Sequence, residues 1–91
     1  MLDWQSRTPL IASILENAVN GTSLTEIMYN TYLSHDSVQK FLIFLRNSAL
    51  LEFDEVRQLY KTTKKGEMFL DGYHNVLKLL TDDVLPNNLS R

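Results

Sequence analysis

The sequence of 91 residues predicts one mainly α-helical domain with a single β-hairpin, in the order helix, helix, helix, strand, strand, long helix. Three observations support this prediction. Capping residues precede each helical segment, and apolar residues within these segments recur at spacings of three and four. One short segment after the third helix alternates with period two instead. We expect a single domain over residues 1–81, with its last helix over about 64–81, and a flexible tail over residues 82–91.

The first helix is predicted from its start signal and its apolar spacing. Thr8 should cap it, and Pro9 suits the first helical position. Asn20 and Gly21 should end it, because glycine adopts the left-handed conformation without strain. The apolar residues at helical spacing between them are Leu10, Ile11, Ile14, Leu15 and Ala18.

Two further helices follow closely. Residues 23–26, Ser-Leu-Thr-Glu, have the pattern of a capping box at the start of a short second helix. Ser34 should cap a third helix directly afterwards, and residues 47–49 should end it. The third helix is expected to bury one apolar face, made of Val38, Phe41, Leu42 and Leu45.

The hairpin and the last helix complete the prediction. Residues 50–53 and 57–62 are expected to be strands, joined by a turn at Asp54-Glu55. Thr63 should cap the last helix. The apolar stripe of that helix contains Phe69, Tyr73, Val76, Leu77 and Leu80.

Composition excludes several classes of protein. The absence of cysteine excludes disulfide scaffolds and cysteine zinc sites. The N-terminal residues do not have the pattern of a signal peptide, and no apolar run is long enough for a membrane, so we expect a cytoplasmic protein. His35 and His74 have no second ligand at useful spacing, and no catalytic motif is present. We therefore expect no enzyme activity, metal, cofactor or small-molecule ligand.

The order of elements is that of a winged helix-turn-helix, since a short turn joins the second and third helices and the hairpin follows directly. The sequence also resembles the small archaeal winged-helix regulators of the ArnR-like type over about residues 8–80. Residues 27–34, 38–42 and 60–67 carry this resemblance, and the last is the most specific. There a tyrosine closes the wing, and a threonine–lysine–glycine run opens the next helix. The resemblance implies DNA binding and a homodimer formed through the last helix.

Two departures from the family pattern concern the wing. The family often has a glycine after the third helix, where this sequence has Ser48-Ala49, so Asn47 is expected to supply the left-handed turn. The wing tip, Asp54-Glu55, is acidic and would repel phosphate if it pointed at DNA.

Charge is unevenly distributed along the chain. The net charge is −2, but residues 37–66 contain six basic and three acidic residues. A locally basic face can meet phosphates on an otherwise acidic protein. Gln39 suits adenine, Lys40 suits guanine or phosphate, and the hairpin lysines suit the DNA backbone. The predicted DNA-binding residues are Ser23, Thr25, Ser34, His35, Ser37, Gln39, Lys40, Arg57, Lys61, Lys64 and Lys65.

Other interpretations of these residues remain open. The third helix could present an ordinary solvated face, Ser23 could serve only as a cap, and the last helix could pack entirely within the chain. The acidic wing tip and the apolar residues Ile43 and Phe44 also suit a winged-helix module that binds protein and not DNA. A general DNA-organising protein is a third alternative, which the lack of an excess of positive charge disfavours.

Overall fold

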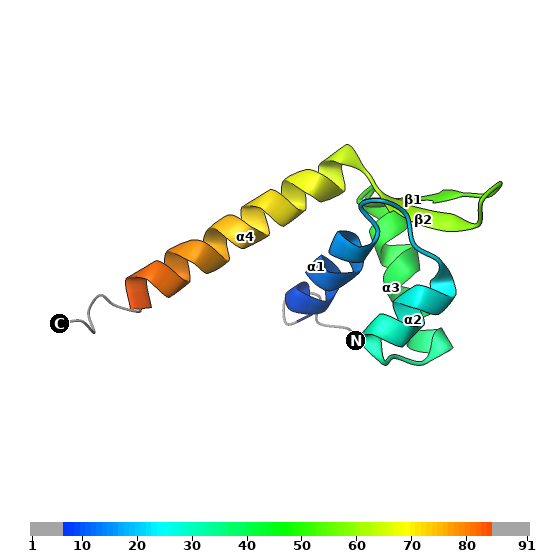
Figure 1. Cartoon of the computed structure of the whole chain (residues 1–91), viewed down its shortest axis with the longest axis horizontal. Helices are drawn as coiled ribbons and strands as arrows, with labels where there is room; N and C mark the ends of the chain where they lie inside the picture. The colour runs from blue at the N-terminus through cyan, green and yellow to red at the C-terminus, as the bar shows by residue number, and fades with distance from the viewer. Residues whose placement is uncertain (1–6, 85–91) are drawn as a thin grey trace.

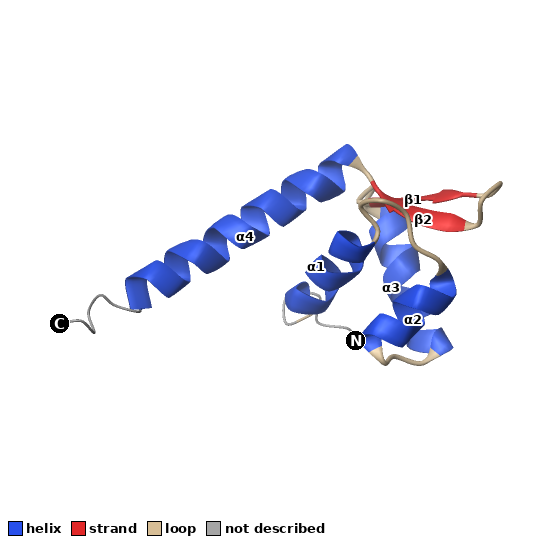
Figure 2. Cartoon of the chain, in the orientation of Figure 1, coloured by secondary structure: helices blue, strands red, loops and turns tan. Residues whose placement is uncertain are grey.

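The computed structural model describes residues 7–84, and it confirms the predicted order of elements (Figures 1 and 2). Three helices come first, a two-stranded hairpin follows, and a long helix ends the described part. Their bounds are α1 Thr8–Asn17, α2 Leu24–Thr31, α3 His35–Asn47, β1 Leu51–Asp54, β2 Leu59–Thr62 and α4 Lys64–Val84. The mainly helical fold with a hairpin wing is therefore the one the sequence predicts.

The core lies between the first three helices, the hairpin and the start of α4. Helix α1 contacts α2, β2 and α4, and its Ile14 and Leu15 are completely buried, as is Ala18 directly after it. All four residues expected on the apolar face of α3 are buried too. The whole cluster consists of Ile11, Ala12, Ile14, Leu15, Ala18, Ile27, Val38, Phe41, Leu42, Leu45, Leu51, Tyr60 and Leu70.

The hairpin is tied to α1 by buried polar contacts. Strands β1 and β2 are antiparallel, and Phe53 pairs with Tyr60 with ring centroids 4.6 Å apart. The Thr62 hydroxyl donates to the Leu15 carbonyl at 2.6 Å, and the Thr62 amide donates to the Ala18 carbonyl at 3.0 Å. These bonds give the carbonyl groups at the end of α1 a second donor beside the backbone amides of Ala18 and Gly21. Residue Thr22 also exchanges two backbone hydrogen bonds with Tyr60.

The long last helix leads away from the hairpin (Figure 1). With 21 residues, α4 has a length of about 32 Å. Leu70 reaches the core, but from Val76 to Leu80 all of the apolar side chains are exposed. The helix continues three residues past its expected end at residue 81. The rest of the predicted flexible tail, residues 85–91, lies outside the described residues.

Two predictions about the ends of α1 were wrong. Arg7 occupies the N-cap position of α1, and Thr8 is already helical. The helix ends at Asn17 and not at Asn20, because the Ala18 carbonyl accepts hydrogen bonds from Gly21 and Thr62. Gly21 is left-handed as expected, with φ +97°.

The left-handed residue after α3 is Ala49, with φ 62°, and not Asn47. The Leu50 amide donates to the Leu45 carbonyl, and the Ala49 amide donates to the Arg46 carbonyl. This pair of bonds is a Schellman motif, which requires the left-handed conformation at Ala49. Alanine bears strain in this conformation that a glycine would not.

The hairpin turn is longer than predicted. It comprises residues 55–58, with Gln58 left-handed at φ 59°, so β1 runs to Asp54 and β2 begins only at Leu59. Arg57 is therefore a turn residue and not a strand residue. A four-residue loop is a common hairpin connection, and two acidic residues are a weak signal for its length.

Candidate nucleic-acid interface

The start of α3 is organised by two serines. Ser34 is the N-cap, and its hydroxyl oxygen accepts from the Ser37 amide at 3.2 Å. The Ser34 hydroxyl also donates to the Ser37 hydroxyl oxygen at 3.2 Å. Ser34 is thus occupied by capping, whereas the Ser37 hydroxyl keeps a proton to donate to a ligand.

The predicted base-reading residues lie along two different edges of the exposed face of α3. His35 and Gln39 lie one turn apart, with 3.5 Å between the Gln39 amide nitrogen and His35 Nε2. Lys40 lies on the opposite edge, where it lines a small hollow with Ser37 and Arg7. Exposed Ile43 continues the face one turn beyond Gln39 and Lys40. The face is polar at its N-terminal end and carries one large apolar side chain, Ile43, further along.

The start of α2 is a capping box, as predicted. The Ser23 hydroxyl oxygen accepts from the Glu26 amide at 3.1 Å, and Glu26 Oε1 accepts from the Ser23 amide at 3.1 Å. Thr25 beside them is exposed. A carboxylate therefore already occupies the helix N-terminus at which Ser23 and Thr25 were expected to contact phosphate.

Ser23→Ala is expected to lower the free energy of unfolding by about 1 kcal/mol, because the helix loses its N-cap. Hydrogen bonds from the Ser23 amide and then from the Thr22 hydroxyl hold the pKa of Glu26 below its ordinary value of 4.5. A carboxyl whose pKa is lowered by folding stabilises the protein above its unfolded-state pKa, and this contribution is lost as the pH falls through the folded-state pKa.

Chemical denaturation of Ser23→Ala and Glu26→Gln at neutral pH, and again well below pH 4.5, measures both effects. The loss caused by Glu26→Gln should disappear in acid. Thr25→Ala, in the same helical turn but outside the capping box, is the control. Equal losses at the two pH values for Glu26→Gln would contradict the assignment.

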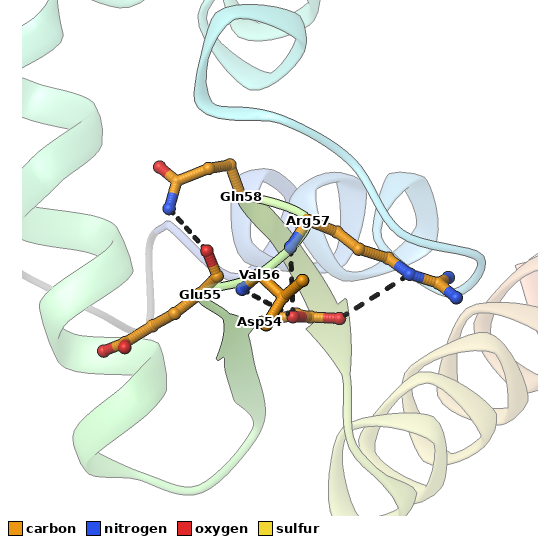
Figure 3. Close-up of polar contacts among 5 residues, drawn as sticks. All are labelled: Asp54, Glu55, Val56, Arg57 and Gln58. Atoms are coloured by element: carbon orange, nitrogen blue, oxygen red, sulfur yellow. Dashed lines mark hydrogen bonds and ion pairs between the residues drawn. The ribbon is translucent and has the colours of Figure 1, made fainter.

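At the wing tip, the Asp54 side chain points toward the backbone of its own turn (Figure 3). Asp54 Oδ1 accepts from the Val56 amide at 3.0 Å and from the Arg57 amide at 3.2 Å. Arg57 Nε also lies 4.0 Å from Asp54 Oδ2. The Asp54 charge is thus directed at the loop and at Arg57, whereas the Glu55 side chain points away from both (Figure 3).

The predicted basic cluster is a line of separate side chains and not one patch. Arg57 lies in the turn at the far end of the hairpin, and Lys61 is exposed on β2 opposite Glu52. Lys64 and Lys65 lie at the other end, in the first turn of α4. Lys65 Nζ donates to the Ser48 carbonyl at 2.8 Å, so this lysine also holds the end of α3.

Sequence reasoning missed two exposed residues at this surface. Arg7 belongs to the hollow beside Ser37 and Lys40, where it adds a second positive charge. Tyr32, in the turn between α2 and α3, is left-handed and 91% exposed. A tyrosine hydroxyl at this position can donate to a phosphate. Arg7 was missed because it is distant from α3 in the sequence. Tyr32 was missed because the left-handed turn that contains it was not predicted.

The residues predicted for a dimer interface lie along an apolar groove between α4 and the start of α1. Phe69 and Tyr73 are half-buried against the core, with ring centroids 6.3 Å apart, whereas Val76, Leu77 and Leu80 are exposed. The groove is lined by Thr8, Pro9, Met68, Phe69, Gly72, Tyr73, Val76, Leu77 and Leu80.

The two histidines are separate in the structure. His35 lies on α3, and His74 of α4 contacts the Glu16 carboxylate of α1. Within residues 7–84, no three histidine, cysteine or acidic residues gather in a way that could hold a metal ion. None of the helices in that range combines the length and the apolar character needed to cross a membrane.

A short turn between α2 and α3, an exposed α3 face and a hairpin directly after it define a winged helix-turn-helix domain, a class of fold that typically binds DNA and is not enzymatic. A family model described as winged helix-turn-helix matches residues 5–81, and the chain belongs to this family. A search of curated proteins found no match. The narrower resemblance to ArnR-like archaeal regulators stays a prediction.

Proposed function

We propose that this protein binds double-stranded DNA as a sequence-specific transcriptional regulator, with α3 in the major groove. The observation that carries the proposal is the division of α3 into a fully buried apolar face and an exposed face that begins with hydrogen-bonding side chains. A recognition helix contacts base edges mainly through residues near its N-terminal end. Ser37, Gln39 and Lys40 lie in this half of the helix.

Each of these residues suits a different contact. Gln39 can form a paired hydrogen bond with adenine, and Lys40 can reach guanine or a phosphate. Arg7 beside Lys40 supports phosphate binding at the same edge. The Lys61 and Lys64 side chains are exposed and, among the residues that the structure describes, form no side-chain hydrogen bond or ion pair, so they are available to the DNA backbone. Arg57 and Lys65 already have partners within the chain.

The net charge of −2 sets a condition on this proposal. Affinity for phosphates depends on the local basic residues, because lysine and arginine release counterions when they neutralise phosphates. Binding should therefore weaken steeply with added salt. The inward position of Asp54 supports the approach of the wing to DNA, since the hydrogen bonds of the turn and Arg57 partly compensate its charge.

The proposal includes a homodimer formed through α4. Val76, Leu77 and Leu80 remain exposed in the single chain although they are large and apolar. Pairing through these residues would bury them and give two recognition helices related by a two-fold axis. The apolar lining of the groove on both sides of Tyr73 supports this choice of surface.

Lys40→Ala and Gln39→Ala are expected to weaken binding by about 5- to 150-fold, which corresponds to about 1–3 kcal/mol for a base contact. The probe is the duplex that the wild-type protein selects from a random pool, measured by fluorescence anisotropy at several salt concentrations. Circular dichroism checks the fold of each variant.

Asn75→Ala, on exposed α4, is the control for both substitutions and should leave the affinity unchanged. If wild-type protein selects no duplex and shows no salt-sensitive binding at low ionic strength, the proposal fails.

One observation favours a second candidate, a protein-docking domain. Ile43 is exposed, and it lines a hollow with Arg46 and Phe53, where the Arg46 guanidinium lies 5.6 Å from the Phe53 ring centroid. Such a partly apolar surface on the recognition helix suits a protein partner. Ile43→Ser should leave DNA affinity nearly unchanged if α3 reads bases through its first turns.

A further inference from the structure

Ile43 is the large apolar side chain of α3 that remains mostly exposed, at 56%. Each residue of a helix turns by about 100°, so Ile43 lies between the edge of α3 that carries Gln39 and the edge that carries Lys40. Single exposed apolar residues are common on protein surfaces. Ile43 differs from them in its position, because it lies near the centre of the face that the proposed function directs at DNA.

The charges around Ile43 suit DNA as the partner of this side chain. Lys40 lies three residues before it and Arg46 three residues after it, so a cation flanks it on each side along the helix. Residues 37–47 contain no acidic side chain. Glu52 of β1 lines the same hollow as Ile43, but a lysine lies opposite it on β2. Ile43 is therefore an apolar side chain between two cations, on a helix surface that complements a polyanion.

We infer that Ile43 packs against the 5-methyl group of a thymine in the major groove, close to the base that Gln39 contacts. This inference rests on the proposed function and specifies part of the sequence that α3 recognises. The thymine methyl is the apolar group that base edges present in the major groove, and apolar side chains pack against it. The exposed face of α3 would then contact bases with hydrogen-bonding side chains first and with an apolar side chain one turn later.

Thymine is favoured at this contact because it alone offers an apolar group. Guanine and adenine present hydrogen-bonding atoms at their major-groove edges, and cytosine presents an amino group. Ile43 can satisfy none of these groups, and removing their water without a replacement lowers affinity. Packing against a methyl group instead removes apolar surface of both partners from water, which raises affinity about fourfold for one carbon group.

The spacing along α3 limits which thymine Ile43 can contact. Gln39 and Ile43 are four residues apart, so they are separated by about 6 Å along the helix axis. Successive base pairs in DNA are about 3.4 Å apart. The thymine should therefore lie within two base pairs of the base pair that Gln39 contacts, on either strand. Because Gln39 suits adenine, the inference predicts A·T base pairs at two nearby positions of the bound sequence.

Deoxyuridine tests the contact directly, because it differs from thymidine in the missing methyl group. Each thymine of the duplex selected by the wild-type protein is replaced in turn, and fluorescence anisotropy gives the affinities of wild type and of Ile43→Ala. One replacement should weaken wild-type binding about fourfold and leave the binding of Ile43→Ala unchanged. The comparison of the four affinities removes any effect of uracil on the duplex alone.

Ile43→Val and Lys40→Ala are the matched controls. Ile43→Val keeps a branched apolar side chain and should keep most of the effect of the methyl group. Lys40→Ala weakens binding from another edge of the same face, but the same replacement should still lower its affinity about fourfold. Since Ile43 is exposed, circular dichroism should show the same fold for both Ile43 variants.

Gln39→Ala locates the neighbouring base pair, because the loss of a base contact relaxes specificity at that position. A duplex without any sensitive thymine would show that α3 contacts bases only through its first turns, and it would overturn the inference. A sensitive thymine more than two base pairs from the Gln39 position, or an equal loss in Ile43→Ala, would overturn it too. These three results leave the proposed function in place, whereas a wild-type protein that selects no duplex overturns both.

Discussion

Gly66→Ala should lower the free energy of unfolding by about 2–3 kcal/mol, which corresponds to a fall in Tm of about 8–24 °C for a domain of this size. The added Cβ would lie 2.4 Å from the Leu50 carbonyl oxygen and 2.5 Å from Thr62 Cγ2. Because the first of these atoms belongs to the backbone, the chain can relieve the collision only by moving α4 away from the end of α3.

Thermal and denaturant unfolding of Gly66→Ala measure this loss. Gly72→Ala is the matched control, since the same methyl group meets open space in the same helix. That variant should keep or raise the stability of the single chain, and measurements at several protein concentrations separate this effect from any change in pairing. Equal stabilities for the two variants would show that α4 is not held tightly at Gly66.

The second large effect is expected from the exposed end of α4. Val76→Glu combined with Leu80→Glu should make the protein monomeric and reduce its affinity for the selected duplex on the order of 100-fold or more, because two linked sites bind far more tightly than one. Both side chains are more than half exposed, so the fold of the single chain should be unaffected.

Sedimentation gives the oligomeric state of this variant, and fluorescence anisotropy gives its affinity. Lys78→Glu together with Asn75→Glu adds the same number of acidic residues to the same helix outside the predicted interface residues. A monomeric variant that binds the duplex as tightly as wild type would contradict the need for a dimer. A variant that remains dimeric would contradict the assigned surface.

The helices were predictable from the sequence because their signals are local. The capping box at Ser23 and Glu26 and the cap at Ser34 were predicted correctly, as was the buried face of α3. The errors had two causes, a contact distant in sequence at the end of α1 and a local motif with an unusual residue after α3. The end of α1 depends on Thr62, and the turn after α3 depends on a Schellman motif at an alanine, which local propensity disfavours.

The candidate site was predictable only in part. The exposed residues of α3 follow from helical periodicity, so Gln39 and Lys40 could be selected. The role of Lys65 could not be predicted, because its hydrogen-bond partner is the Ser48 carbonyl, 17 residues earlier in the chain. Arg7 was missed for the same reason, since only the tertiary structure brings it next to Lys40. Residues 60–67, on which the resemblance to archaeal regulators mainly rests, serve chiefly to connect the hairpin with the helices.

The joint between α3 and α4 has a consequence for any pair of chains. The Thr63 hydroxyl donates to the Ala49 carbonyl at 2.6 Å and accepts from the Gly66 amide at 3.0 Å, while Lys65 holds the Ser48 carbonyl. The direction of α4 relative to α3 is therefore fixed within each chain. A dimer built on α4 would hold its two recognition helices at one separation, so its operators should tolerate base changes between the half-sites far better than the insertion or removal of a base pair.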